Sequence, residues 1–314
     1  MAIKAKDIFS ELRAITKPTY RDKINNFMIA DTKSRLVGNG YEIHNIRKWQ
    51  PGDPLEHIDL EASLATWPKE LYILEMFETK SSPVIFIADI SPSIFVRIDQ
   101  GGGKLKLLLQ LMGAIGLGAN RLSNPVGVMC FSDKVETYMP PKLGPSWLYY
   151  MINVLCSKAM VEERPSFKKN IKQAFNLNSV LKFLVARLSL KKCSIIILSD
   201  FTDFIGGQAE FDLKILKILS FVNNFNVICI FLDEPEEFLW ARGFGTVAVL
   251  NAETGRVEEV KASDAGKVRG RFVEKREDLR RQLEKIGIDS VVVSYGNHFN
   301  DVAQFLSERQ AKSV

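Results

Sequence analysis

The sequence predicts an α/β protein with a doubly wound, mostly parallel sheet and a smaller N-terminal helical and β segment. Four short, nearly continuous apolar runs indicate strands buried on both faces, as parallel strands are. They lie at residues 83–90, 126–131, 193–200 and 226–233. Segments with helical spacing of apolar residues separate these runs, and that alternation is typical of a parallel sheet with helices on both sides.

The remaining patterns extend this arrangement toward the C-terminus. Helical patterns lie at residues 105–122, 146–155, 179–188, 211–222, 277–287 and 301–310. Alternating or short apolar runs predict a strand at 134–139, a hairpin around Glu-Thr-Gly at 246–260, and a last strand at 290–294. We therefore expect one domain over residues 83–314.

Residues 1–82 have a different pattern and are predicted to form a separate N-terminal segment. Apolar residues recur at helical spacing to about residue 36, with Pro18 interrupting the run. Residues 38–49 then have the pattern of a strand and 70–78 that of a half-buried strand, and the Gln-Pro-Gly-Asp sequence at 50–53 predicts a turn.

Composition excludes several classes of protein. The net charge is +5, and Lys and Arg are mixed with Asp and Glu, without the basic, aromatic-rich run that follows a nucleic-acid backbone. The N-terminus is polar and charged, unlike a signal peptide, and no apolar stretch is long enough to span a membrane. We expect a soluble, cytoplasmic protein that binds no nucleic acid.

The cysteines fit a reducing compartment. None belongs to a C-x-x-C pair, and three lie in or beside apolar runs, so we expect small buried side chains with free thiols. They are Cys130, Cys156, Cys193 and Cys229.

Polar side chains follow two of the apolar runs, where an open parallel sheet binds its ligands. Asp89, Ser91 and Ser93 end the first run, and Asp200 ends the third, with Asp203 close behind. If the two strands are neighbours across the point where the winding reverses, these groups share one crevice. Carboxylates and hydroxyls are hard oxygen ligands, so the pattern predicts Mg²⁺ or Mn²⁺ with positions left open for a carboxylate from a partner.

Other interpretations of these residues remain open. The serines could cap a turn while Asp89 accepts hydrogen bonds from loop N–H groups. Asp89 could also be a phosphoryl-accepting nucleophile, although Ser91 stands where that chemistry needs an acid. Gly101-Gly102-Gly103-Lys104 lacks the spacing of a phosphate-binding loop and predicts a flexible loop before a helix. No G-x-S-x-G or H-E-x-x-H pattern is present.

Several stretches together carry a more specific signal. They are RKWQPGDPLEHIDLEAS, LYILEMFE, PVIFIADISPS, VGVMCFSD, IIILSDFTD and FLDEPEEFLWARGFGTVAVLNAETGRVEEV, spread over residues 47–260. In these the chain resembles the von Willebrand factor A-like family of unassigned function (domain of unknown function 58) that is typically encoded beside MoxR-type AAA+ ATPases.

The resemblance implies a von Willebrand A-like fold with a metal-ion-dependent adhesion site. Asp89, Ser91 and Ser93 would be its first loop and Asp200 its last carboxylate. A middle-loop Thr is also implied, and here only Asn178 and Ser179 are available, with Ser179 the better match.

The N-terminal part of the family pattern departs at two places. The chain has His57-Ile58-Asp59-Leu60 where Arg-Ile-Asp-Trp is usual, and Ser63-Leu64-Ala65 where Ser-Ala-Arg is usual. Many relatives carry membrane helices, and no such helix is expected here.

Arg47, Asp53 and Asp59 in this segment could form a surface that supports the crevice or docks a partner. Alternatively, Gly52 and Asp53 make a turn, and Arg47 pairs with Asp53 or Asp59 to hold the segment together.

The functional expectation is a non-enzymatic, metal-dependent protein-interaction module, an adaptor or cofactor of a MoxR-type AAA+ ATPase in protein assembly or maturation. The ATPase partner follows from the resemblance alone. Two alternatives stay open: a metal-free structural scaffold, and a metal-dependent phosphohydrolase with Asp89 as nucleophile.

Overall fold

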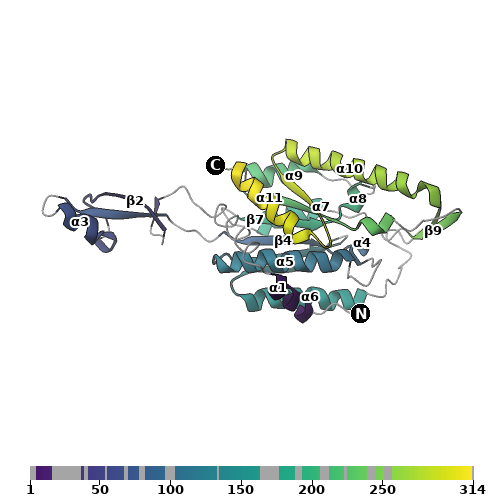
Figure 1. The fold of residues 1–314 in the computed structure, drawn as a ribbon, viewed down its shortest axis with the longest axis horizontal. Helices are drawn as coiled ribbons and strands as arrows, with labels where there is room; N and C mark the ends of the chain where they lie inside the picture. Colours follow the sequence, from purple (N-terminus) through teal and green to yellow (C-terminus); the bar gives the residue numbers. More distant parts are fainter. Residues whose placement is uncertain are drawn as a thin grey trace.

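The protein is a mixed α/β structure around a central six-stranded sheet, seen in a computed structural model (Figure 1). The structure describes residues 5–15, 37–38, 42–53, 55–66, 70–77, 82–95, 103–132, 134–162, 177–187, 193–205, 212–222, 225–238, 245–250 and 257–312. The strand order in the central sheet is β11-β8-β7-β4-β5-β6.

The four predicted apolar runs are confirmed as the central strands. The strands of this sheet are β4 (Val84–Asp89), β5 (Val126–Phe131), β6 (Val135–Lys142), β7 (Ser194–Ser199), β8 (Asn226–Asp233) and β11 (Asp289–Ser294). All neighbours are parallel except β5 and β6, which are antiparallel. Every residue of β4, β5 and β7 is buried, as expected for strands covered on both faces.

Helices cover both faces of the sheet, and alternate residues of β4 point into two separate cores. One core contains Phe86 and side chains of α5 (Gly103–Arg121), α6 (Pro145–Glu162) and α11 (His298–Lys312). The other contains Ile87 and side chains of α7 (Leu177–Arg187), α8 (Thr202–Ile205), α9 (Leu213–Lys217) and α10 (Ala265–Lys285). The predicted doubly wound arrangement is therefore present as a mostly parallel sheet between two helical layers.

The first helix joins the larger core. α1 (Ala5–Ile15) contacts α5 and α6, and its Ile8 and Leu12 are fully buried there (Figure 1). The beginning of the predicted N-terminal segment thus packs with the central domain.

The rest of the described N-terminal segment has a sheet of its own. Strands β1 (Val37–Gly38) and β2 (Glu42–Lys48) both pair antiparallel with β3 (Tyr72–Phe77). Between β2 and β3 the chain forms η1 (Leu55–His57) and α3 (Leu60–Thr66). The strands predicted at 38–49 and 70–78 are confirmed, and α3 was not predicted. The helical pattern of residues 16–36 lies outside the described residues.

Elements near the C-terminus are longer or less regular than the sequence suggests. The predicted hairpin is the antiparallel pair β9 (Thr246–Leu250) and β10 (Val257–Lys261). α10 begins 12 residues before the predicted start at 277, because Gly266, Gly270 and many charges hide the helical pattern there. α9 continues into a π-helical turn, η2 (Ile218–Val222). The short helices α4 (Pro92–Phe95), η3 (Pro235–Phe238) and η4 (Ala262–Asp264) complete the chain.

One edge of the central sheet is irregular. β6 carries Pro140 and Pro141, and its register with β5 shifts beside them. Gly127 of β5 lies under this bulge. A Cβ atom there would come within 2.8 Å of the Pro141 nitrogen and 2.9 Å of the Met139 oxygen. The bulge therefore needs glycine at this place.

Candidate functional site

The two predicted acidic positions meet at the point where the strand order reverses. β4 pairs with β5 on one side and with β7 on the other, so the crevice opens at the carboxyl ends of β4 and β7. Asp89 is the last residue of β4, and Asp200 directly follows β7. Both side chains are almost fully buried. The predicted adjacency of these two strands is confirmed.

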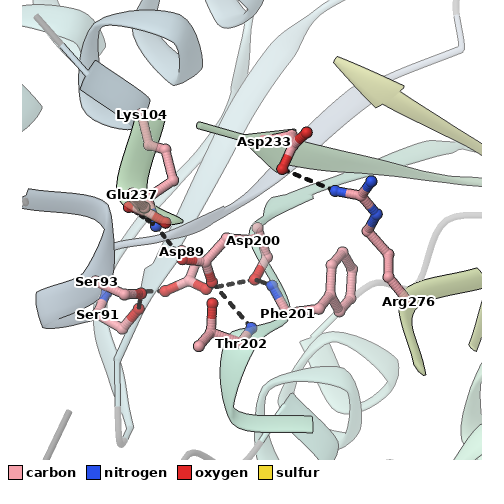
Figure 2. Close-up of polar contacts among 11 residues, drawn as sticks. Asp89, Ser91, Ser93, Lys104, Asp200, Phe201, Thr202, Asp233, Glu237 and Arg276 are labelled. Carbon is pink, nitrogen blue, oxygen red and sulfur yellow. Dashed lines mark hydrogen bonds and ion pairs between the residues drawn. The ribbon is translucent and has the colours of Figure 1, made fainter. Parts of the chain in front are cut away.

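Asp89 is held entirely by hydrogen-bond donors. Asp89 lies beside Ser91 and Ser93 (Figure 2), and its Oδ1 accepts the backbone N–H of Ser91 at 2.8 Å. Its Oδ2 accepts the hydroxyl of Ser199. The Ser199 hydroxyl in turn accepts the backbone N–H of Phe201 at 2.9 Å. Ser199 therefore links the end of β7 to the Asp89 carboxyl group.

The two serines after β4 present their hydroxyls to each other. Ser91 Oγ and Ser93 Oγ lie 3.1 Å apart, and both side chains are buried. α4 begins at Pro92, and Ile94 N–H donates to Ser91 O at 3.0 Å, so the serines belong to a tight turn. Hydrogen bonding to Ser93 also stabilises the charged form of Asp200. One connected polar cluster therefore contains Asp200 and the three residues Asp89, Ser91 and Ser93.

The backbone beyond Asp200 adopts an unusual conformation. Phe201 has φ of 54°, in the left-handed region that costs a non-glycine residue about 1–2 kcal/mol. Its ring is buried 4.4 Å from that of Phe231, which offsets this cost. Asp200 Oδ1 then accepts the N–H of Thr202 at 3.1 Å. The turn leaves Asp200 Oδ2 facing the crevice.

A buried lysine occupies that remaining oxygen. Lys104, at the start of α5, places Nζ 2.7 Å from Asp200 Oδ2 and 2.5 Å from Glu237 Oε1 (Figure 2). The Lys104 side chain is only 2% exposed, and that of Glu237, in η3, is 22% exposed. The lysine that follows the three glycines is thus a buried part of the crevice.

Charge in the crevice is unevenly compensated. Burial would lower the pKa of Lys104, but the carboxylates of Asp200 and Glu237 outweigh it and raise that pKa. Burial would raise the pKa of Asp200, but the Lys104 ammonium outweighs it and lowers that pKa. Asp200 and Lys104 therefore form an ion pair at neutral pH.

The pKa of Asp89 is shifted in the opposite direction to that of Asp200. Burial, and next the charge of Asp200, raise its pKa to about 8, against hydrogen bonds from Ser199 and Ser91. Burial also raises the pKa of Glu237 to about 7, although Lys104 opposes the shift. Within the described residues, no cationic side chain bonds to Asp89. The carboxyl group of Asp89 would release its proton readily only if another positive charge came close.

The remaining residues predicted near the site lie on neighbouring helices. Ser179 is in α7 and Asp203 is in α8, and both side chains fall outside the part that the structure describes. Asn178, the alternative to Ser179, accepts the backbone N–H of Asp212 at 3.0 Å. The side-chain oxygen of Asn178 therefore helps to begin α9.

The N-terminal residues form local contacts in their own sheet. Arg47 forms a two-pronged ion pair with Asp53, at 2.7 and 2.8 Å, and the Asp53 carboxylate also accepts Gln50 N–H. The hydrogen bond from Arg47 lowers the pKa of Asp53 to about 2. Asp59 caps α3 by accepting the N–H groups of Glu61 and Ala62. These contacts match the structural interpretation of the segment.

Three functional candidates were missed from the sequence: Lys104, Ser199 and Glu237. For Lys104 a signal existed, because helical spacing places it in line with the buried Leu108 and Leu111. A lysine in a buried stripe needs a charged partner. Nothing in the pattern around Glu237 distinguishes it from its acidic neighbours.

The two aspartates of the cluster could hold a hard cation only if hydroxyl groups or water supplied further oxygen ligands. In the described part of the chain, no three side chains of His, Cys, Asp or Glu are grouped closely enough to hold a metal ion. Asp89, Ser91, Ser93 and Asp200 supply oxygen only, which fits Mg²⁺ or Mn²⁺ and not a soft metal. The four cysteines are buried, as predicted, and lie outside this cluster.

Across the described ranges, no helix combines the length and apolarity needed to cross a membrane. No curated protein matches the chain. One solved structure, described as an uncharacterized membrane spanning protein from Vibrio fischeri, is similar at 13% identity and a TM-score of 0.22. The similarity covers 73% of this chain and 99% of that one. At this TM-score the similarity supports no statement about fold or location.

A family described as protein of unknown function DUF58 matches residues 45–282. The match includes β3, both acidic strand ends, Lys104 and Glu237, and therefore the whole crevice. Since it spans well over half of the sequence, the chain belongs to the DUF58 family.

Proposed function

We propose that this protein is a non-enzymatic interaction module of the von Willebrand A-like kind, which binds Mg²⁺ or Mn²⁺ in the crevice and through it an acidic side chain of a protein partner. One observation carries the proposal. Asp89 is a buried carboxyl group at the switch point, beside two serine hydroxyls and a second carboxylate, and no described cationic side chain bonds to it.

The charges of the crevice support a divalent cation. Asp89, Asp200 and Glu237 bring three carboxyl groups against the single ammonium of Lys104. A dication beside Asp89 would stabilise its ionised form and remove the electrostatic conflict with Asp200. Asp89, Ser91 and Ser93 would hold the ion, with Asp200 binding directly or through water and Ser179 as a further candidate. A bound ion would supply a positive charge for a partner's carboxylate.

The partner that we propose is a MoxR-type AAA+ ATPase or its client. This part of the proposal depends on the family resemblance, since such proteins are typically encoded together. Ser91 stands two residues after Asp89, at the position where phosphoryl transfer would need an acid, and this favours binding over phosphoryl transfer.

The decisive test is calorimetric titration of Mg²⁺ and Mn²⁺ into chelator-treated protein. Wild type is expected to bind, and Asp89→Asn, which keeps the size of the side chain and one acceptor oxygen but removes the charge, is expected not to. Asp53→Asn is the matched control, because it removes a carboxylate from the Arg47 pair outside the crevice. Equal binding by wild type and Asp89→Asn would contradict the site.

A second candidate function is a metal-free scaffold, and the Lys104 contact favours it. The ammonium already neutralises Asp200 inside the crevice. If folded wild type binds neither ion, with or without an acidic partner peptide, the scaffold is the better description.

A further inference from the structure

Lys104 occupies the oxygen of Asp200 that faces the crevice. Asp200 Oδ1 is engaged by Thr202 N–H, and Oδ2 is engaged by Lys104 Nζ at 2.7 Å. Both side chains are buried, so water does not screen this contact. A cation that takes over Asp200 Oδ2 would therefore have to displace the ammonium.

The structure also provides a second acceptor for the ammonium. Glu237 Oε1 lies 2.5 Å from Lys104 Nζ, and the Glu237 side chain is partly exposed while that of Asp200 is buried. Lys104 could leave Asp200 and keep Glu237 as its partner. The lysine therefore bridges one acid at the end of β7 to another in η3.

We propose that Lys104 is a built-in competitor of the metal ion, with Glu237 as the group that holds its ammonium when an ion takes over Asp200. This inference rests on the proposed function and adds a specificity-determining residue to the same site. It predicts weak metal binding by the isolated protein and stronger binding when the lysine is drawn away from Asp200.

The first experiment compares Mn²⁺ titrations of wild type, Lys104→Met and Lys106→Met. Methionine keeps most of the length and apolar character of the lysine stem but not its charge. Removing the competitor is expected to tighten Mn²⁺ binding by roughly tenfold or more, the size expected for loss of one buried charge contact. Lys106→Met is the matched control, because Lys106 lies two residues further along α5 and pairs with Glu11 of α1.

The control separates direct competition from general electrostatics. Lys106→Met removes the same charge from the same helix and is expected to bind Mn²⁺ as wild type does. Equal tightening in both lysine variants would overturn the proposal, because it would show a long-range effect of net charge. Unchanged affinity in Lys104→Met would also overturn it, and metal binding by wild type would then leave the proposed function intact.

Stability gives a second readout, since Lys104→Met leaves Asp200 and Glu237 without their ammonium. Mn²⁺ is expected to raise the melting temperature of Lys104→Met more than that of wild type, because the ion replaces the lost charge. Lys104→Gln, which keeps a hydrogen-bond donor, is measured alongside. If both variants stay unfolded in Mn²⁺ while Lys106→Met folds, the ion cannot replace the ammonium and the proposal fails. If all variants fold and none binds Mn²⁺, the proposed function fails as well.

Discussion

Lys104 Nζ lies 2.7 Å from Asp200 Oδ2, although 96 residues separate the two in the sequence. The pair joins the start of α5 to the end of β7, the strand that pairs with β4. Because both partners are buried, the contact influences the stability of the domain as well as the chemistry of the crevice.

The first prediction concerns the contribution of this ion pair to the free energy of unfolding of the protein. Lys104→Met is expected to cost about 3–5 kcal/mol, because it leaves buried carboxylates uncompensated. Asp200→Asn should cost less, since Lys104 keeps Glu237. In urea denaturation the double variant is expected to lose clearly less than the sum of the two single losses.

An exposed pair is the control for that cycle. Lys267 pairs with Asp264 at 3.1 Å, with the lysine side chain 74% exposed. Lys267→Met should cost less than about 1 kcal/mol. Strictly additive effects of Lys104→Met and Asp200→Asn would contradict a direct interaction.

The second prediction concerns Ser199, which donates to Asp89 and accepts from Phe201 N–H. Ser199→Ala leaves a buried N–H and a carboxyl oxygen without that partner and should cost about 1–3 kcal/mol. Metal affinity should also fall, because the Asp89 carboxyl group loses its positioning contact.

Ser82→Ala is the matched control for Ser199. Ser82 is also buried, but its hydroxyl has no hydrogen-bond partner among the described residues. Its loss should be neutral or slightly stabilising in thermal denaturation. A similar cost for both serines would argue that packing, and not the hydrogen bonds of Ser199, determines the result.

The third prediction concerns Gly127 beneath the bulge of β6. A Cβ atom at this position would press on the backbone at Pro141 and Met139, so Gly127→Ala should cost about 1–3 kcal/mol. Gly270, inside α10, has open space around it. Gly270→Ala should therefore raise the free energy of unfolding by about 0.5–1 kcal/mol. Opposite shifts in melting temperature are expected, and shifts of the same sign would contradict this account.

The fourth prediction concerns pH and the buried ring of His298, which is 4% exposed. Burial, and next the charge of Lys106, lower its pKa from 6.5 to about 4, while Glu11 opposes the shift. The unfolded chain therefore binds this proton first as the pH falls. Stability should be lost between about pH 6.5 and 4, by an amount on the order of 3 kcal/mol.

Urea denaturation at a series of pH values tests this effect against His298→Phe, which keeps a ring beside Tyr295 and Phe299. The difference in unfolding free energy between wild type and this variant should change over that pH interval and be constant above pH 7. A constant difference throughout would show that His298 does not titrate as expected.

Much of the central sheet was predictable, because buried parallel strands leave apolar runs that few other structures produce. The adjacency of Asp89 and Asp200 followed from the rule that ligand sites lie at the switch point. The start of α10 was not predictable, since its first turns carry glycines and charges and pack little of their surface. The apolar spacing of the N-terminal residues correctly predicted a helix, but periodicity alone does not show that Ile8 and Leu12 pack in the same core as α5.

The candidate site was predictable only in part. Asp89, Ser91 and Ser93 are neighbours in sequence, so one strand end brings them together. Lys104 and Glu237 reach the same place through the packing of α5 and η3, which local patterns do not specify. Ser199 was hidden because a serine at the end of an apolar run is common, and only the pairing of β4 with β7 gives it Asp89 as a partner.

The two prolines of β6 also affect how copies of this protein behave at high concentration. An outer strand normally offers free N–H groups to which a strand of another molecule can add, which is how many sheet proteins aggregate. Pro140 and Pro141 have no N–H to offer, and the shifted register bends the strand away from a regular edge. The protein should therefore resist edge-to-edge polymerisation on this side of its sheet.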